Sequence, residues 1–482
     1  MNHSEIPSDP EQLGRLVAAL QKPGCFEHTV KHFEIIETHI SIVLLTGEYA
    51  YKFKKPVDFG FVDFTTLQKR KHYCEEELRL NSRLAPEIYL QVASITGSID
   101  MPRLDSGPAI EYCVKMRQFP HSAELHNALA QNKVDQSAFR ELGTAIACFH
   151  EHAEAADQSN DYGSFDQVRN QCLENFSSMA DGLPGLPVAD DLSMLKTWTG
   201  QQLSEQQELI ESRRKNGRVR ECHGDMHVTN LIWLQDTIQV FDCIEFNPEL
   251  RWIDCMSEIA FLLMDLDMRQ QADKAHVFLD AYLEYGGDYS GLPLLPLFYV
   301  YRSLVRAKIA FLQARQDSHK TDTGLLDRIG KHIQLARSSI EISAPASIII
   351  TTGLSGSGKT TITEPLIPAT GALRVRSDVE RKRLAGLNAT DRSHSKIGQG
   401  LYAAGHTQET YQHLRDCARA VISAKHPVII DATFLKLSQR RMFQELATEL
   451  NVPYRILDCQ APESILRERI DQRRGDASEA DQ

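Results

Sequence analysis

Two short segments of the chain carry residue types suited to phosphoryl transfer, and the first surrounds Asp225. His223-Gly224-Asp225 precedes Asn230 by a short loop, and Asp242 follows twelve residues later at the end of an apolar run. A carboxylate can accept the proton of an attacking hydroxyl, and an amide with a second carboxylate can hold Mg²⁺. The spacing predicts Asp225 as the base and Asn230 and Asp242 as metal ligands. The alternative is a polar loop between two core strands.

The second segment is a glycine-rich loop between a strand pattern at 348–352 and a predicted helix. Its glycines free backbone N–H groups to wrap phosphates, and the helix N-terminus adds positive potential. Lys359 would reach the β- and γ-phosphates, and Thr360 would hold Mg²⁺. A chance glycine-rich turn would lack the strand and the helix on either side. We therefore predict a P-loop nucleotide site formed by Gly353, Ser355, Gly356, Ser357, Gly358, Lys359, Thr360 and Thr361.

Further candidate residues lie at the ends of two later apolar runs. Asp378 ends the run that begins at Leu373, and Asp431 ends the run that begins at Val428. We expect Asp378 to act as base for an acceptor hydroxyl, with Arg381 on its phosphate. Asp431 is expected at the Mg²⁺ site beside Thr360.

Two arginines near the end of the chain could close the P-loop site. Arg469 and Arg473 are four residues apart, so they share one face of a predicted helix and could cover the γ-phosphate as a lid. The alternative is a solvated helix face on which they pair with Glu463 and Glu468.

The first half of the chain should supply a lysine and an acid to the site of Asp225. Ala50, Lys52 and Lys54 lie on one face of a predicted strand at 49–54. The Ala-x-Lys spacing of Ala50 and Lys52 favours Lys52, but Lys54 stays open because it falls on the same face. A helix predicted over 66–84 offers three acids, Glu75, Glu76 and Glu77. We favour Glu77.

Two kinds of architecture must position these residues. Strand patterns dominate up to about residue 118, and helical spacing dominates from about 122 to 215 and from 253 to 340. Beyond a linker with Pro345, apolar runs alternate with helices, which indicates a parallel sheet. We predict an α+β domain at 1–340, with lobes at about 25–118 and 119–340. A linker at 341–347 and an α/β domain at 348–482 follow.

Composition narrows the class of protein. The chain has 482 residues, enough for more than one core, and a net charge of -12, which opposes non-specific nucleic-acid binding. Its ten cysteines include no CxxC pair, so we expect neither a zinc site nor a redox pair. The pattern shows no signal peptide and no run of about 18 apolar residues, so we expect a cytoplasmic protein without a membrane partner.

Residues 25–335 resemble the aminoglycoside phosphotransferase and choline-kinase-like group through His223–Asn230, Asp242 and Asp254. The resemblance implies a bilobal, protein-kinase-like fold in which Asp254 supports the catalytic loop. No glycine-rich loop precedes Lys52, which departs from protein kinases and fits this group, so the turn at 38–41 must cover any phosphates. We expect Glu245 either to contact the metal ligand Asp242 or to cap the loop.

Residues 346–474 resemble the small P-loop kinases, such as the phage polynucleotide kinase domain, zeta-type toxins and gluconate kinase. Such folds usually carry a further strand after the lid, whereas this chain ends in the polar run 475–482, which indicates a truncated or unusually short C-terminus. The order of the two halves resembles a bacterial bifunctional family that joins an aminoglycoside phosphotransferase-like domain to a P-loop ATPase or kinase domain.

These patterns predict an ATP- and Mg²⁺-dependent phosphotransferase with two nucleotide sites and small-molecule hydroxyl acceptors. One alternative is a P-loop kinase or ATPase with a non-catalytic, kinase-like binding or regulatory module. Another is a nucleic-acid end kinase, although the acidic charge makes nucleic acid an unexpected partner. No pattern identifies either acceptor or an oligomeric state.

Overall fold

The computed structural model describes residues 6–60, 62–104, 107–180, 182, 188–316, 323–341, 346–389, 391 and 403–472. It divides into two compact units: Met1–Val134 with Glu221–Ile253, and Asp135–Arg220 with Asp254–Gln482. The segment around Asp225 thus groups with the N-terminal strands. Residues 342–345 of the predicted linker, and the predicted short end at 475–482, lie outside the described residues.

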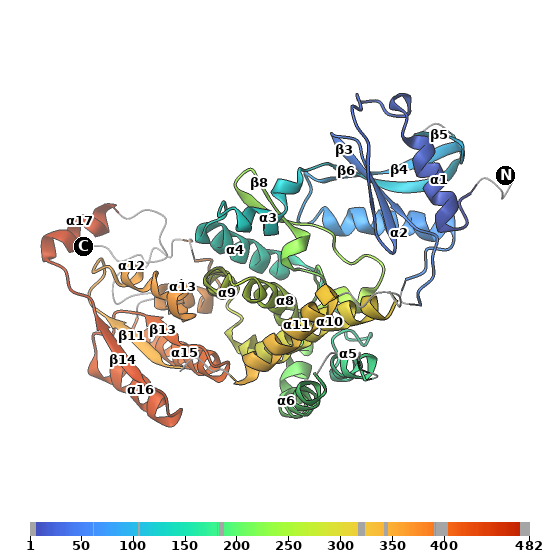
Figure 1. Ribbon diagram of the computed structural model, residues 1–482. Coiled ribbons are helices and arrows are strands. Elements are labelled where there is room, and N and C mark those ends of the chain that lie inside the picture. The colour runs from blue at the N-terminus through green and yellow to red at the C-terminus, as the bar shows by residue number, and fades with distance from the viewer. Residues whose placement is uncertain are drawn as a thin grey trace. The chain divides into compact units, whose positions relative to one another are not determined.

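The first unit is built on a six-stranded antiparallel sheet of order β1-β2-β3-β6-β4-β5. Its strands are β1 Glu34–Glu37, β2 Ser41–Leu45, β3 Tyr49–Lys54, β4 Tyr89–Ser98, β5 Met101–Leu104 and β6 Ala109–Arg117. Helix α2, Leu67–Asn81, lies along this sheet against β4 and β6 (Figure 1). The predicted strand at 49–54 and the helix predicted over 66–84 therefore form, as β3 and α2.

Helix α1, Pro10–Leu20, was not predicted, although its signals are in the sequence. Asp9 caps it by accepting from Gln12 N at 2.9 Å, and Pro10 occupies its first turn. Four apolar residues at helical spacing are buried in the sheet core with β2 and β3: Leu13, Leu16, Val17 and Leu20. The helix covers the sheet by burying this one face.

The rest of the first unit carries the predicted catalytic loop. A short 3-10 turn, η4 Val228–Asn230, leads into the hairpin of β8 Leu231–Leu234 and β9 Thr237–Val240. Gln235 and Asp236 turn the hairpin with φ of 50° and 58°. Helices α3 Leu125–Ala130 and α7 Pro248–Arg251 complete this region.

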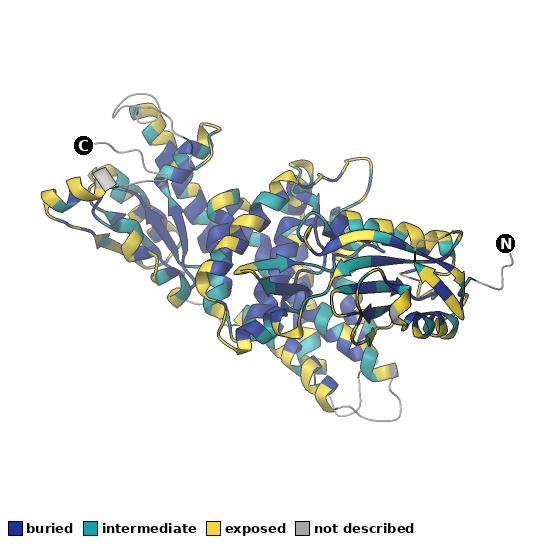
Figure 2. Ribbon diagram, turned by 90° about the horizontal axis from the view of Figure 1, so that it is seen from above, coloured by how far each residue is buried: buried dark blue, intermediate teal, exposed yellow. Residues whose placement is uncertain are grey.

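The second unit begins as a helical assembly. Its helices are α4 Gln136–His152, α5 Phe165–Ser178, α6 Ala189–Lys215, α8 Cys255–Met268, α9 Ala272–Gly286, η5 Tyr289–Leu294, α10 Leu295–Gln316 and α11 Thr323–Glu341. Helix α8 is buried along nearly its whole length, so it forms the centre of the packing (Figure 2). The chain passes from one unit to the other within the short strands β7 Val219–Glu221 and β10 Trp252–Asp254.

The C-terminal part of the second unit is a four-stranded sheet of order β12-β13-β11-β14 in which all pairs are parallel. Its elements are β11 Ile348–Thr352, α12 Lys359–Thr363, α13 Leu366–Thr370, β12 Leu373–Arg376, α14 Ser377–Leu384, α15 Ala404–Ser423, β13 Val428–Asp431, α16 Leu437–Glu449, β14 Tyr454–Asp458 and α17 Glu463–Gln472. The central strand β13 is buried at every position, as the apolar run predicts. Parallel order places the carboxyl ends of β11, β12 and β13 at one edge.

No helix among the described residues is both long and apolar enough to cross a bilayer.

Candidate active sites

Three charged side chains from separate segments of the first unit meet at Lys52. Lys52 lies on β3, Glu77 on the buried face of α2, and Asp242 just after β9. Lys52 Nζ lies 2.8 Å from Glu77 Oε1 and 2.6 Å from Asp242 Oδ1. Glu77 is fully buried, whereas 43% of the Asp242 side chain is exposed. The cluster is therefore anchored inside the fold and open to solvent at Asp242.

The electrostatics of this cluster keep Lys52 and Glu77 charged. Burial alone would lower the pKa of Lys52, but the carboxylates of Asp242 and Glu77 outweigh it and hold this pKa well above its usual value. Burial would likewise raise the pKa of Glu77, yet Lys52 and Lys54 lower it to about 2. Each charge is thus stabilised by the opposite charge beside it.

Lys54 forms a second buried ion pair behind the first. Its Nζ lies 2.7 Å from Glu77 Oε2 and also bonds Glu245 Oε1, and both side chains are almost completely buried. Glu77 thus binds one lysine through each carboxylate oxygen. Glu245, which was expected either to contact Asp242 or to cap the loop, pairs with Lys54 on β3. Burial raises the pKa of Glu245, which Lys54 opposes and Glu77 reinforces.

The other two glutamates of α2 take no part in this cluster. Glu75 is exposed and lies 3.6 Å from Lys71, whereas Glu76 pairs with Arg79 at 2.8 Å. Successive helical residues turn by about 100°, so only one of three consecutive acids can face the sheet. The structure brings Glu77 to Lys52 and Lys54.

The catalytic loop holds Asp225 in one orientation. Asn230 Nδ2 donates to Asp225 Oδ2 at 2.9 Å and to its carbonyl at 3.0 Å, and His227 Nε2 lies 3.3 Å from Oδ2. Gly224 has φ of 87°, and a Cβ there would stand 2.6 Å from Leu250 O, so the turn before Asp225 requires glycine.

Backbone contacts tie this loop to the segment that carries Asp242. Phe241 N donates to Asn230 O at 3.0 Å, and His223 Nε2 lies 2.9 Å from Phe241 O. Asp242 itself has φ of 65°, a conformation that costs a non-glycine residue energy, and its N–H donates to Tyr89 Oη at 3.1 Å. Held strain of this kind is concentrated at functional positions.

Asp254, which the resemblance places in support of the catalytic loop, lies in the second unit. It caps α8 and accepts two hydrogen bonds from Arg213, at 2.7 and 2.8 Å, while the same guanidinium binds Asp288. The structure therefore shows Asp254 as part of a buried ion-pair group among the helices.

The P-loop in the second unit is shaped by its glycines. Gly353, Gly356 and Gly358 have φ of 139°, 82° and 89°, which other residues adopt only with strain. A Cβ on Gly353 would lie 2.3 Å from Cys459 O. The hydroxyl of Ser357 is buried and has no hydrogen-bond partner. The glycines thus let the backbone of the loop curve tightly, and the Ser357 hydroxyl inside it can accept or donate a further hydrogen bond.

The side chains of Thr360, Asp431 and Lys359 at the end of the loop are of the types that bind a cation and phosphate. Thr360 Oγ1 donates to Asp431 Oδ2 at 2.6 Å, so the two predicted magnesium-site residues are in contact. Lys359 Nζ donates to the carbonyls of Gly353 and Leu354 at 3.1 and 2.9 Å. Thr361 is exposed on α12, and Ser355 lies in the loop itself.

Asp378 and Arg381 lie together on α14. Arg381 Nη1 donates to Asp378 Oδ1 at 3.0 Å. Asp378 was predicted at the end of a strand, but β12 stops at Arg376 and the helix begins at Ser377, so this carboxylate lies in the first helical turn. A carboxylate is favourable there because it faces the positive end of the helix dipole.

Only one of the two predicted lid arginines can be placed. Arg469 Nη1 donates to Gly356 O at 3.2 Å, which brings α17 to the P-loop. Arg473 lies outside the described residues.

Arg374 connects the P-loop to helix α9, a contact that no sequence pattern indicated. Its Nη1 donates to Thr360 O at 3.2 Å, and its backbone N donates to Asp280 Oδ1 at 2.8 Å. The neighbouring Arg376 binds Glu284 on the same helix at 3.0 Å. Burial raises the pKa of Asp280 to about 6, and Arg374 opposes this rise.

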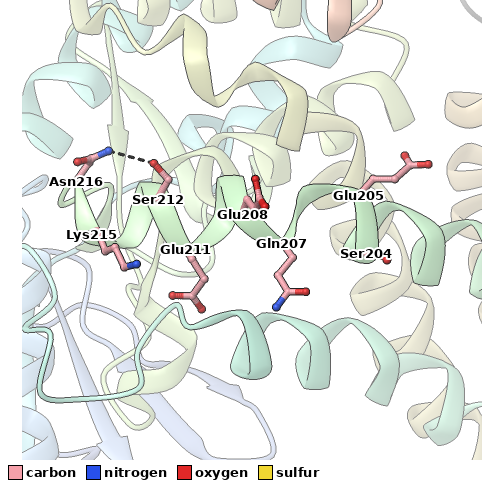
Figure 3. Close-up of a pocket in the computed structure, with 8 residues that line it drawn as sticks. All are labelled: Ser204, Glu205, Gln207, Glu208, Glu211, Ser212, Lys215 and Asn216. Carbon is pink, nitrogen blue, oxygen red and sulfur yellow. Dashed lines mark hydrogen bonds between the residues drawn. The ribbon is translucent and has the colours of Figure 1, made fainter.

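A surface hollow of about 760 Å³ also lies along α6, where its lining residues project as Figure 3 shows. Four charged residues are among those that line it: Glu205, Glu208, Glu211 and Lys215. None of the predicted site residues lines this hollow.

Comparison with known proteins gives one family match and several relatives. Residues 348–482 match the family model described as AAA domain. Two proteins of Mycobacterium tuberculosis and one of Mycobacterium bovis, each described as uncharacterized, are 26% identical over 447 residues, which cover 93% of this chain and 87% of each relative.

Among solved structures, a choline kinase from Cryptosporidium parvum is 10% identical with a TM-score of 0.42, covering 69% of this chain and 96% of that one. An ethanolamine kinase from Plasmodium vivax is 11% identical with a TM-score of 0.39, covering 64% and 81%. An ADP-bound aminoglycoside phosphotransferase is 13% identical with a TM-score of 0.32, covering 69% and 99%.

The predicted fold class is confirmed by the sheets themselves and, for the C-terminal part, by the family match. Over residues 348–482, the C-terminal P-loop domain of the chain matches the AAA domain family.

Proposed function

We propose that the protein is an ATP- and Mg²⁺-dependent phosphotransferase with two nucleotide sites, each acting on hydroxyl groups of small molecules. The observation that carries the proposal is the contact of Lys52 with both Glu77 and Asp242, at 2.8 and 2.6 Å. A lysine held by a buried acid and facing a partly exposed acid is suited to bind phosphates beside a metal ion.

The residues of the kinase-like site fit a magnesium nucleotide. Asp242 offers a partly exposed carboxylate, and Asn230 uses its amide N–H groups on Asp225, which leaves its amide oxygen as a ligand. Oxygen ligands of this kind suit Mg²⁺. When bound, the ion would supply positive charge that neutralises the transferred phosphoryl group.

Asp225 would act as the base at this site. Its side chain is 33% exposed, so an acceptor hydroxyl can reach it, and Asn230 fixes the orientation of the carboxylate. The carboxylate would take the hydroxyl proton as the oxygen attacks the γ-phosphorus and ADP leaves. Lys52 would hold the nucleotide phosphates, with Glu77 keeping the lysine in place.

The P-loop site would transfer phosphate with a different set of residues. Its curved backbone and the unpaired hydroxyl of Ser357 fit phosphate oxygens, and Thr360 with Asp431 fits a magnesium ion. Asp378 would accept the proton of the second hydroxyl, while Arg381 and Arg469 would neutralise phosphate charge.

The test uses the full chain with γ-labelled ATP and a metabolite extract. We would compare wild type, Asp225→Asn, Lys359→Ala and the double variant, with Asp236→Asn in the β8–β9 turn as the control for Asp225→Asn. We expect two sets of labelled products. Asp225→Asn should lower one set by about 10²- to 10⁴-fold and leave the other within about twofold, and Lys359→Ala should do the reverse. Full labelling of both sets by Asp225→Asn would contradict the assignment of the base.

A second candidate function keeps the P-loop half as the enzyme and makes the kinase-like half a binding or regulatory module. It is favoured by the turn between β1 and β2, Thr38-His39-Ile40, which has no glycine to follow the phosphates closely. Under this alternative, Lys359→Ala would remove every labelled product and Asp225→Asn would remove none.

A further inference from the structure

A group of metal-ligand type lies between helices α14 and α15, on residues that neither proposed site uses; Glu380 and Cys417 are buried and His413 is partly exposed. His413 Nε2 lies 2.9 Å from Glu380 Oε2 and 3.5 Å from Cys417 Sγ. All three ligand atoms lie within 4.8 Å of one another. His413 and Cys417 are four residues apart on α15, so they share one helix face, and Glu380 reaches them from α14.

The spacing of these atoms suits a tetrahedral zinc ion. Zinc bonds of about 2.0–2.3 Å to nitrogen, oxygen and sulfur place neighbouring ligands roughly 3.3–3.7 Å apart. The nitrogen–sulfur separation of 3.5 Å already has this value, and the nitrogen–oxygen separation of 2.9 Å requires a small outward shift of Glu380. Imidazole, thiolate and carboxylate are the ligand types that zinc takes in proteins.

Two neighbouring residues bear on this group: Arg383 binds Glu380, and Tyr289 has a buried hydroxyl without a hydrogen-bond partner. Arg383 binds the other oxygen of Glu380, Oε1, and so fixes the carboxylate as an outer hydrogen bond fixes a metal ligand. The hydroxyl of Tyr289 is buried, with the residue 2% exposed, and has no hydrogen-bond partner. Burial and then the charge of Glu380 raise the pKa of Tyr289 well above its usual value, with Cys417 adding to the rise. The turn that carries Tyr289, η5, packs against α15, which carries His413 and Cys417.

We propose that Glu380, His413 and Cys417 bind a divalent zinc-type ion, with a water molecule as the fourth ligand. The ion joins α14 to α15. Because α14 also carries Asp378 and Arg381, the ion fixes the helix that presents these two residues. This site goes beyond the proposed function and differs from the expectation that the cysteines suggest no zinc site, since its ligands come from two helices rather than from a CxxC pair.

The test measures zinc on the untagged full chain after removal of metals with a chelator, addition of Zn²⁺ and dialysis. We expect wild type and the buried-cysteine control Cys172→Ser to retain about one zinc ion per chain more than Cys417→Ser and His413→Gln. Cobalt(II) should give a thiolate-to-cobalt absorption band in wild type, and this band should be lost in Cys417→Ser. Zinc should also raise the Tm of wild type but not that of His413→Gln.

Two outcomes would overturn the site. One is equal zinc content in wild type and His413→Gln, a variant at a partly exposed position that keeps a hydrogen-bonding side chain. The other is a wild-type cobalt complex without a thiolate band, which would leave the three residues as a hydrogen-bonded group only.

Discussion

The kinase-like site and the P-loop site are held together by different forces. At the first, charged side chains as far apart in sequence as Lys54 and Glu245 pair with one another inside the fold. At the second, the shape comes from a few successive residues whose glycines adopt positive φ, and from one contact between Thr360 and Asp431. The first site is therefore vulnerable to the loss of a charge, and the second to the gain of a methyl group.

The largest expected effect comes from Glu77→Gln at the kinase-like site. The change keeps the shape but leaves Lys52 and Lys54 buried with one carboxylate fewer. Breaking a buried ion pair costs about 3–5 kcal/mol, so the free energy of unfolding of the first unit should fall by about this amount, measured by calorimetry.

Glu75→Gln on the same helix is the matched control. Glu75 is exposed and 3.6 Å from Lys71, so its loss should change stability by less than about 1 kcal/mol. Equal destabilisation by the two variants would show that the buried network does not stabilise this unit, and the contrast between the sites would fail.

The next effect concerns Gly353→Ala in the P-loop. Alanine would need φ of 139° and would place its Cβ 2.3 Å from Cys459 O. We expect the Kd for ATP at this site to rise by about 5- to 150-fold, because such strain costs about 1–3 kcal/mol. Transfer at the kinase-like site should not change. Gly405→Ala, where an added Cβ meets nothing within 4 Å, should leave both unchanged, and a rise in Kd there of the same size would show a general loss of fold.

The smallest effect should come from Arg469→Ala. Arg469, the predicted lid residue on α17 that the structure describes, donates a hydrogen bond to Gly356 O of the P-loop at 3.2 Å. Loss of one such bond should lower turnover at the P-loop site by about 2- to 10-fold. Arg467→Ala, which removes an exposed pair with Glu463 on the same helix, should have little effect. If both variants behave alike, the solvated-face interpretation of α17 is preferred.

The two sites also differ in how far sequence reasoning could reach. The P-loop was predicted residue by residue, because its geometry is local and its strand and helix are adjacent to it. The lysine and acid of the other site were predicted by type, but three consecutive glutamates could not be separated until α2 showed which face it buries. The pairing of Lys54 with Glu245 depends on the register of β3 against a segment far along the chain, which no local pattern records.

The strands β3, β11 and β13 were predicted at their observed bounds, because apolar or alternating runs mark them directly. Helix α1 was missed even though Asp9, Pro10 and its apolar spacing are ordinary helix signals. The group of Glu380, His413 and Cys417 could not be predicted, because it needs two helices to come side by side. Local patterns gave the elements, and only packing gave the contacts between them.

Asp280 and Glu284 on α9 bind Arg374 and Arg376 on β12. These contacts affect how the chain could be cut into fragments or recombined with a related one. A cut between residues 341 and 348 would remove the covalent connection but leave these contacts in place, so we expect the two fragments to stay associated after proteolysis. An isolated 348–482 fragment would instead expose a buried arginine and lose an acceptor for its main chain. Exchange of the C-terminal domain between related proteins would therefore succeed only if the recipient helix carried the two acids as well.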